Sequence, residues 1–200
     1  MRENPTNTKI LKILLKDFTA KPTITFLAKE MGLTRVGVWK IIKKLEKDKL
    51  VILSHIGTGK TSISLTSLNW ENPLVEKIIA LVLIEDALKN QIWRSNFAEL
   101  EGNTDFLVLY GSILHSSKDA NDIDILTIVS NKKKFLKTDE IIRKIQKTQV
   151  KKIHSEIFTI KEFKEELQKP NKIFVDAVKK GIVLFGQEKF IQLLKTIKER

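Results

Sequence analysis

Two aspartates separated by one apolar residue, Asp122-Ile123-Asp124, stand at the head of an apolar run that ends at Val129. This pattern predicts a β-strand, and residues i and i+2 of a strand project from the same face. The two carboxylates are therefore expected to lie side by side, where their negative charges repel each other. A divalent cation relieves that repulsion, because Mg²⁺ prefers carboxylate oxygens as ligands. The pattern indicates a site for Mg²⁺ (or Mn²⁺) held by Asp122 and Asp124.

A Gly-Ser pair precedes the two aspartates along the chain. Gly111 and Ser112 follow the apolar stretch FLVLY at 106–110, which predicts another strand. A glycine leaves the backbone N–H groups open to a phosphate, and the Ser112 hydroxyl adds a further donor. His115 and Lys118 lie in the loop that follows, and each is either a phosphate contact or an ordinary solvated side chain. The predicted nucleotide-binding residues are Gly111, Ser112, His115 and Lys118.

Residues 106–129 contain a predicted strand, a Gly-Ser pair, a loop and an Asp-X-Asp strand, in this order. This order resembles the minimal form of the nucleotidyltransferase fold of the DNA polymerase beta superfamily. The resemblance implies that Gly-Ser holds a nucleoside triphosphate (NTP) and that the aspartates bind two metal ions. It also implies a third carboxylate on a later strand, for which Glu156 in KIHSEIFTI is the candidate. On this basis Asp122, Asp124 and Glu156 are the expected catalytic and metal-binding residues. His154 shares the predicted strand face with Glu156, but the sequence identifies no acid-base partner for it.

Two places depart from the pattern of that superfamily. The motif commonly runs Gly-Ser-X-X-Arg-Gly, whereas this chain has His115 and Ser116 at the last two positions, and Asn121 stands where a serine is common. Two functions therefore stay open. One is transfer of a nucleoside monophosphate from NTP to an unknown acceptor, such as a protein or an RNA. The other is an antitoxin-like transcriptional regulator, whose nucleotidyltransferase domain senses nucleotide or mediates dimerisation without turnover.

Positive charge is concentrated in the amino-terminal part of the chain. The whole chain has 36 Lys/Arg against 24 Asp/Glu, which leaves a net charge of +12. Residues 1–70 contain 13 of these basic and 5 of these acidic residues, so this smaller part carries +8 of the excess and the remainder +4. A polyanion is the expected partner. The alternative is a general lysine bias of the proteome.

The amino-terminal part is predicted to contain three helices and a hairpin. Helical periodicity marks residues 9–18, 25–32 and the segment from Arg35, with Thr25 and Thr34 as N-caps and Gly32 as the C-cap of the second helix. Two alternating segments, 51–56 and 62–68, flank the glycine turn GTGK and predict a β-hairpin. This order resembles a winged helix-turn-helix and implies binding to double-stranded DNA.

The helix that starts at Arg35 is the expected recognition element. Its apolar residues Val38, Ile41, Ile42 and Leu45 form one stripe, so that its basic side chains project elsewhere. Trp39 lies either against the DNA backbone or partly in the core. The predicted DNA-binding residues are Thr34, Arg35, Trp39, Lys40, Lys43, Lys44 and, at the wing tip, Lys60.

The polar segment LNWENPL predicts a domain boundary, with residues 1–70 as the winged helix-turn-helix and residues 71–200 as the nucleotidyltransferase-like domain with a leading helix. That helix, predicted over 73–93, has apolar residues on more than one face, which favours a homodimer. Strands at 106–110, 124–129 and 152–160 then alternate with helices at 137–149 and 161–169. The predicted fold class is α+β: a winged helix-turn-helix followed by a nucleotidyltransferase-fold α/β domain with a small mixed sheet.

Composition excludes several other kinds of chemistry. The chain has no cysteine, which excludes disulfides, thiolate zinc sites and a cysteine nucleophile. The longest apolar run, Ile78 to Ile84, is too short to span a bilayer, and the segment MRENPTNTKI has no apolar signal core. We therefore expect a cytoplasmic protein with no membrane partner.

Overall fold

The computed structural model describes residues 5–17, 22–57, 62–169 and 172–198, which form two compact units. The first contains the residues up to Val82 together with those from Leu194 onward, and the second is Leu83–Leu193. The boundary predicted at residue 70 thus falls within the first unit, which also includes the start of the helix predicted at 73–93. None of the helices in the described ranges is both long and apolar enough to cross a membrane.

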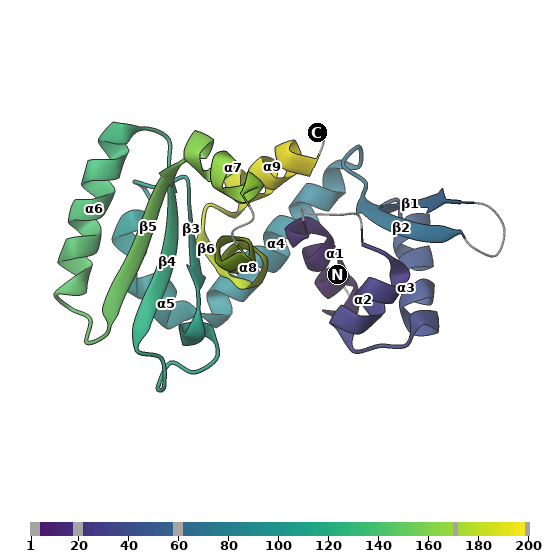
Figure 1. The fold of residues 1–200 in the computed structure, drawn as a ribbon, viewed down its shortest axis with the longest axis horizontal. Coiled ribbons are helices and arrows are strands. Elements are labelled where there is room, and N and C mark those ends of the chain that lie inside the picture. Colours follow the sequence, from purple (N-terminus) through teal and green to yellow (C-terminus); the bar gives the residue numbers. More distant parts are fainter. Residues whose placement is uncertain (1–4, 18–21, 58–61, 170–171, 199–200) are drawn as a thin grey trace. The chain divides into compact units, whose positions relative to one another are not determined.

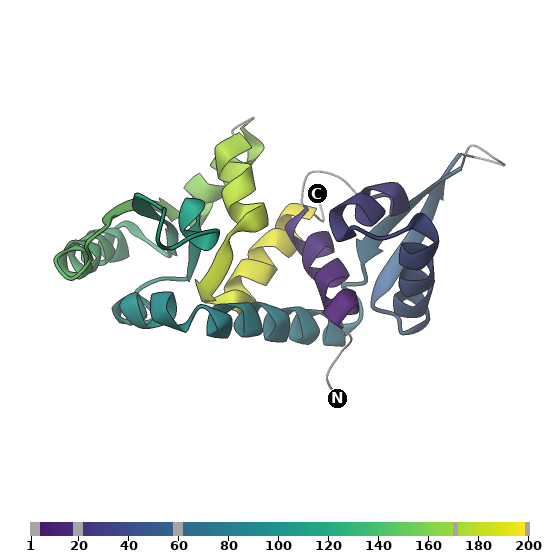
Figure 2. The same ribbon diagram turned by 90° about the horizontal axis from the view of Figure 1, so that it is seen from below.

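The first unit begins with three helices, α1 (Pro5–Lys16), α2 (Ile24–Met31) and α3 (Arg35–Lys47). A hairpin of β1 (Val51–Ile56) and β2 (Ile63–Leu68) follows, with the two strands antiparallel. This is the element order of a winged helix-turn-helix, as the sequence predicts (Figure 2). Its core contains the buried side chains of Ile10, Leu11, Leu14, Leu27, Val38, Ile42, Leu45 and Val51.

Threonine side chains determine where α2 and α3 begin. The Thr34 hydroxyl accepts a hydrogen bond from the backbone N–H of Gly37 at 3.1 Å, as predicted. The prediction that Thr25 caps α2 is wrong, because the Thr23 hydroxyl accepts from the backbone N–H of Phe26 at 3.1 Å. Thr23 is extended and forms a β-bridge with Leu65, so the chain turns into the helix there. Gly32 ends α2 in the left-handed conformation, at φ +66°, as predicted.

The helix predicted over 73–93 is divided into α4 (Pro73–Lys89) and α5 (Gln91–Asn96). The break lies at Asn90, whose side-chain amide donates to the carbonyl of Asp86 at 2.9 Å. Asparagine favours such breaks because its side chain competes for backbone hydrogen bonds. The short helix η2 (Ala98–Leu100) follows α5.

The second unit is built on a four-stranded mixed sheet in the order β5-β4-β3-β6 (Figure 1). Its strands are β3 (Phe106–Tyr110), β4 (Asp122–Val129), β5 (Lys152–Thr159) and β6 (Ile182–Phe185). β4 is parallel to β5, and β3 is antiparallel to both β4 and β6. The parallel pair requires a crossover connection, which α6 (Lys132–Gln146) provides. The remaining helices are η3 (Ser112–Leu114), α7 (Ile160–Gln168), α8 (Lys172–Lys180) and α9 (Gln187–Lys198).

The two faces of this sheet are covered by different helices. On one face, Ile123 and Ile125 of β4 belong to a core that includes Phe97 and residues of η2 and α6. On the other face, phenylalanine rings form edge-on contacts, with Phe106 5.7 Å from Phe163 and 5.3 Å from Phe190 between ring centroids. Alternate residues of β4 are therefore buried in two separate cores, and this fixes which face each side chain joins.

The last helix contributes its end to the first unit. The Lys195 ammonium lies 2.7 Å from the Glu76 carboxylate and 5.4 Å from the centroid of a Trp70 ring. The Lys198 ammonium donates to the backbone carbonyl of Leu14. The first unit is therefore assembled from two stretches that are far apart in the sequence.

Candidate functional site

Asp122 and Asp124 begin β4 and project from the face opposite Ile123, as the strand pattern predicts. The sheet places Tyr110 of β3 and His154 of β5 on either side of Asp124. The His154 Nδ1 atom lies 3.2 Å from Asp122 Oδ2 and 3.5 Å from Asp124 Oδ1. One ligand atom from each of these three side chains lies within 4.8 Å of the others, close enough to hold one ion.

The surroundings of the cluster disfavour the ionised forms of Asp124 and of the neighbouring Tyr110. Burial raises the pKa of the Asp124 carboxyl, the charge of Asp122 raises it further, and His154 lowers it. Burial also raises the pKa of the Tyr110 phenol, as do, in smaller measure, the charges of Glu156 and the two aspartates. The phenol is therefore neutral across the physiological range. A cation at the carboxylates would reverse the electrostatic penalty on Asp124.

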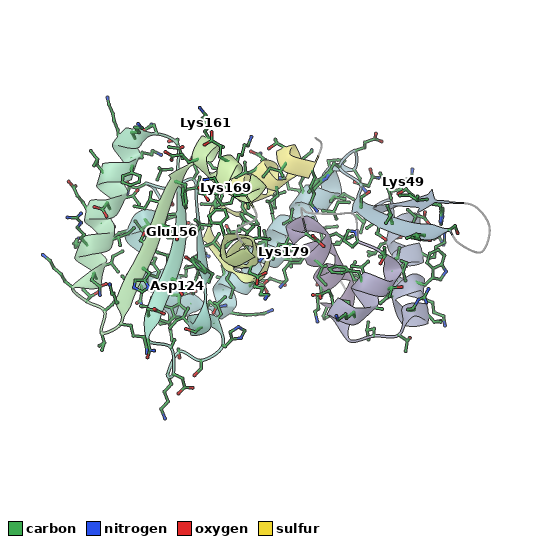
Figure 3. The ribbon with its side chains drawn as sticks, viewed as in Figure 1. Lys49, Asp124, Glu156, Lys161, Lys169 and Lys179 are labelled. Carbon is green, nitrogen blue, oxygen red and sulfur yellow. The ribbon has the colours of Figure 1, made fainter. Side chains whose placement is uncertain are left out.

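Glu156, the predicted third carboxylate, lies on the same face of β5 as His154 but two residues further along the strand. Its partner in the register with β4 is Leu126, whereas the partner of Asp124 is His154. Figure 3 shows Asp124 and Glu156 on these neighbouring strands. The side chain that the structure brings to both aspartates is thus His154, and a ligand role for Glu156 stays a prediction. The signal that identifies His154 is the β4–β5 register, in which it is the partner of Asp124.

Gly111 packs directly against the aspartate cluster. Its φ is +82°, and a Cβ at this position would lie 2.1 Å from Asp124 Oδ2. The glycine is therefore required by the carboxylate beside it, and not only by an approaching phosphate as the sequence suggests. Ser112 is exposed and starts η3, where its carbonyl accepts from the N–H groups of His115 at 2.9 Å and Ser116 at 3.2 Å.

The loop between η3 and β4 carries His115 and Lys118, and both side chains are exposed. The Ser116 hydroxyl donates to the Asp119 carboxylate at 2.6 Å. The ammonium of Lys151, the residue just before β5, donates to the backbone carbonyl of Ala120. It also lies 3.4 Å from the backbone carbonyl oxygen of Lys118. These contacts tie the loop to the edge of the sheet. The phosphate contacts predicted for His115 and Lys118 stay predictions.

The predicted DNA-binding residues lie on one helix apart from Lys60, which is outside the described residues. Thr34 caps α3, and its next residue Arg35 is exposed. Lys40, Lys43 and Lys44 are also exposed, and the helix buries Val38, Ile42 and Leu45 on its other side. The recognition surface expected from the sequence is therefore basic and open to solvent.

Trp39 lines an open groove of about 550 Å³ within the first unit. It is half-buried, with the Lys43 ammonium 5.4 Å from its ring centroid, so it is neither a core residue nor a fully exposed one. The other residues that line the groove come from the starts of α2, α3 and β2: Thr23, Ile24, Thr25, Arg35, Val36, Ser62, Ile63 and Ser64.

No protein-family model and no curated protein matches the sequence. Among solved structures, the chain is similar to a zinc-responsive MarR family member, ZitR of Lactococcus lactis, with 18% sequence identity and a TM-score of 0.35. The match covers 59% of this chain and 70% of that one. A similarity of this size does not assign the chain to a family.

Gly111→Ala is expected to destabilise the second unit by about 1–3 kcal/mol. The new methyl group must displace the Asp124 carboxylate, and the alanine backbone must adopt a positive φ that favours glycine. Chemical denaturation measures this change, and a Mn²⁺ titration should show weaker binding. Gly102→Ala is the control, because a Cβ there has nothing within 4 Å. Equal stability of the two variants would contradict the close contact at Gly111.

Proposed function

We propose that the protein is a DNA-binding regulator whose second unit responds to a nucleotide. The exposed basic face of α3 carries this proposal. In a helix-turn-helix the second helix enters the major groove, and α3 is that helix here. Its exposed basic side chains are Arg35, Lys40, Lys43 and Lys44, which suit the phosphates that flank the groove.

Base recognition is proposed for the first turn of α3. Val36 is 66% exposed there, and an apolar side chain suits the methyl group of thymine in the major groove. Arg35 precedes it and suits a guanine edge or a phosphate. Trp39, on the wall of the groove beside the wing, is placed to lie against a deoxyribose. The phosphate contact predicted for Lys60 belongs to the same proposal.

Two copies of the chain are proposed to pair through α4. One stripe of this helix consists of Leu74, Leu81, Ile84 and Leu88, which are 59, 57, 36 and 51% exposed. In an antiparallel pair with a two-fold axis at Leu81, Leu74 faces Leu88 of the second copy and Lys77 faces Glu85. Such an interface is self-complementary in both shape and charge. Pairing would also place two recognition helices on two half-sites.

For the second unit we propose binding of NTP together with a divalent metal ion. Support comes from the two aspartates beside the Gly111-Ser112 turn, from the mixed sheet, and from the resemblance of this motif to the nucleotidyltransferase fold. The donor set fits a cation, since both carboxylates and His154 direct ligand atoms to one place. When bound, the ion supplies positive charge between the carboxylates and the phosphates. The Ser112 hydroxyl is proposed to donate to a phosphate oxygen.

The regulatory version of this proposal involves no turnover. It is favoured by His115 and Asn121, which depart from the catalytic motif, and by His154 in place of a third carboxylate at the aspartates. The second candidate is transfer of a nucleoside monophosphate to a protein or RNA, which the intact Asp122/Asp124 pair favours. In that reaction an acceptor hydroxyl oxygen bonds to the α-phosphorus and gives up its proton to solvent, while the bond from the α-phosphorus to the oxygen that bridges to the β-phosphate breaks and pyrophosphate leaves.

Replacing Lys40 and Lys43 together by alanine is expected to weaken duplex DNA binding and its salt dependence. Each lost phosphate contact lowers the slope of log K against log salt by about 0.9, so the double variant should lose about 1.8. Fluorescence anisotropy at several salt concentrations measures the slope. Lys132 and Lys133 on α6 are exposed, and alanine at both is the control with equal charge and an unchanged slope. Unaltered binding by the Lys40/Lys43 variant would exclude this face of α3.

Leu81→Asp is expected to produce a monomer, because it places two carboxylates at the proposed two-fold axis. Light scattering after size exclusion gives the mass. Lys77→Glu should weaken the dimer and the added change Glu85→Lys should restore it, since the charges exchange places. Leu136→Asp, at a residue on α6 that is 68% exposed, is the control. A wild-type monomer at micromolar concentration would refute the pairing.

Asp122→Asn is expected to abolish metal-dependent NTP binding in titration calorimetry while DNA binding by the first unit persists, because it removes one charge and one ligand. Asp139→Asn, on α6, is the matched control. Identical isotherms for wild type and Asp122→Asn would contradict the site. Pyrophosphate release from labelled NTP in cell lysate separates the two candidates, since only the transferase releases it.

A further inference from the structure

We infer that the site at Asp122, Asp124 and His154 takes a first-row transition-metal ion in preference to Mg²⁺, and that His154 determines this choice. The inference rests on the metal site of the proposed function and names the class of ion. Its starting point is one ring nitrogen, His154 Nδ1, which faces carboxylate oxygens of both aspartates at 3.2 and 3.5 Å.

These distances are those expected between ligands of one cation. Metal–ligand bonds of about 2.0–2.2 Å separate neighbouring ligand atoms by about 2.8–3.1 Å in octahedral geometry and by about 3.3–3.6 Å in tetrahedral geometry. A hydrogen bond from His154 can account for one of the two contacts. A single N–H points its proton at one acceptor, and 3.5 Å lies beyond the usual range of N–H···O contacts.

The donor types discriminate between ions. Mg²⁺ takes oxygen ligands in a near-octahedral shell and keeps several of its waters, whereas imidazole nitrogen suits Zn²⁺ and the other later ions of the series. Two carboxylates and one imidazole therefore favour Zn²⁺ over Mn²⁺, and Mn²⁺ over Mg²⁺. A third carboxylate at the place of His154 would favour Mg²⁺ instead. In the register Glu156 lies beside Leu126, and its role as a ligand stays a prediction.

The surroundings leave room for an ion and for further ligands. A Cβ at Gly111 would meet Asp124 Oδ2 at 2.1 Å, so only a glycine lets the turn pack this closely against the carboxylate. The side chains of His154, Asp122 and Asp124 are 47, 31 and 22% exposed, so one side of the cluster faces solvent. Water or a phosphate oxygen can complete the coordination there.

The test is a titration of the full-length, chelator-treated protein with Zn²⁺, Mn²⁺ and Mg²⁺ alone, without nucleotide. We expect affinity to fall in that order. His154→Ala should weaken Zn²⁺ and Mn²⁺ binding at least about tenfold and change Mg²⁺ binding little. His154→Asp, which creates three carboxylates, should raise Mg²⁺ affinity while Zn²⁺ affinity falls. His55→Ala removes an exposed imidazole of the first unit and is the control for adventitious binding.

Mn²⁺ binding followed by electron paramagnetic resonance gives a second readout of the same site, and circular dichroism checks that each variant is folded. Equal affinity of the wild type for Mg²⁺ and Zn²⁺, or unchanged Zn²⁺ affinity in folded His154→Ala, would overturn the inference. Because no nucleotide is used, a failure of NTP binding would refute the proposed nucleotide response and leave the metal preference standing.

Discussion

Burial of β4 on both faces constrains the rest of the second unit. Its residues from Ile125 to Val129 are buried, with alternate side chains in the two cores that flank the sheet. A shift by one residue would exchange these two sets and expose apolar side chains at the start of the strand. The position of the two aspartates is therefore determined by apolar packing far from them. Repulsion between their carboxylates costs less than a change of register.

The same constraint explains why three strands contribute to one site. Once β4 is held, the pairings with β3 and β5 place Tyr110, Asp124 and His154 in one row across the sheet. The next row, Val108, Leu126 and Glu156, is already apolar on two of its strands. The sheet thus changes from polar to apolar within two residues along its length. Asp124 and His154 of the first row, together with Asp122, offer ligand atoms that lie within 4.8 Å of one another.

Features set by local chemistry were predicted from the sequence. The β-strand period placed Asp122 and Asp124 side by side, and the caps at Gly32 and Thr34 follow from residue type. His154 was not predicted, because the register of a parallel pair depends on its crossover helix and its core rather than on any nearby sequence. Some helix ends also differ from the prediction, because a cap residue was not identified. The helix predicted from residue 137 begins at Lys132, since Asn131 accepts a hydrogen bond from the N–H of Lys134 at 3.0 Å.

The origin of the first unit from two distant stretches of sequence has a consequence for synthesis on the ribosome. The ammonium of Lys195, which pairs with Glu76, emerges only after all of Leu83–Leu193 has been translated. At roughly 5–20 residues per second this interval is on the order of ten seconds. During that time residues 1–82 lack the contacts that the residues from Leu194 onward later make with them. The order of translation therefore separates the synthesis of residues 1–82 from that of the segment that completes their unit.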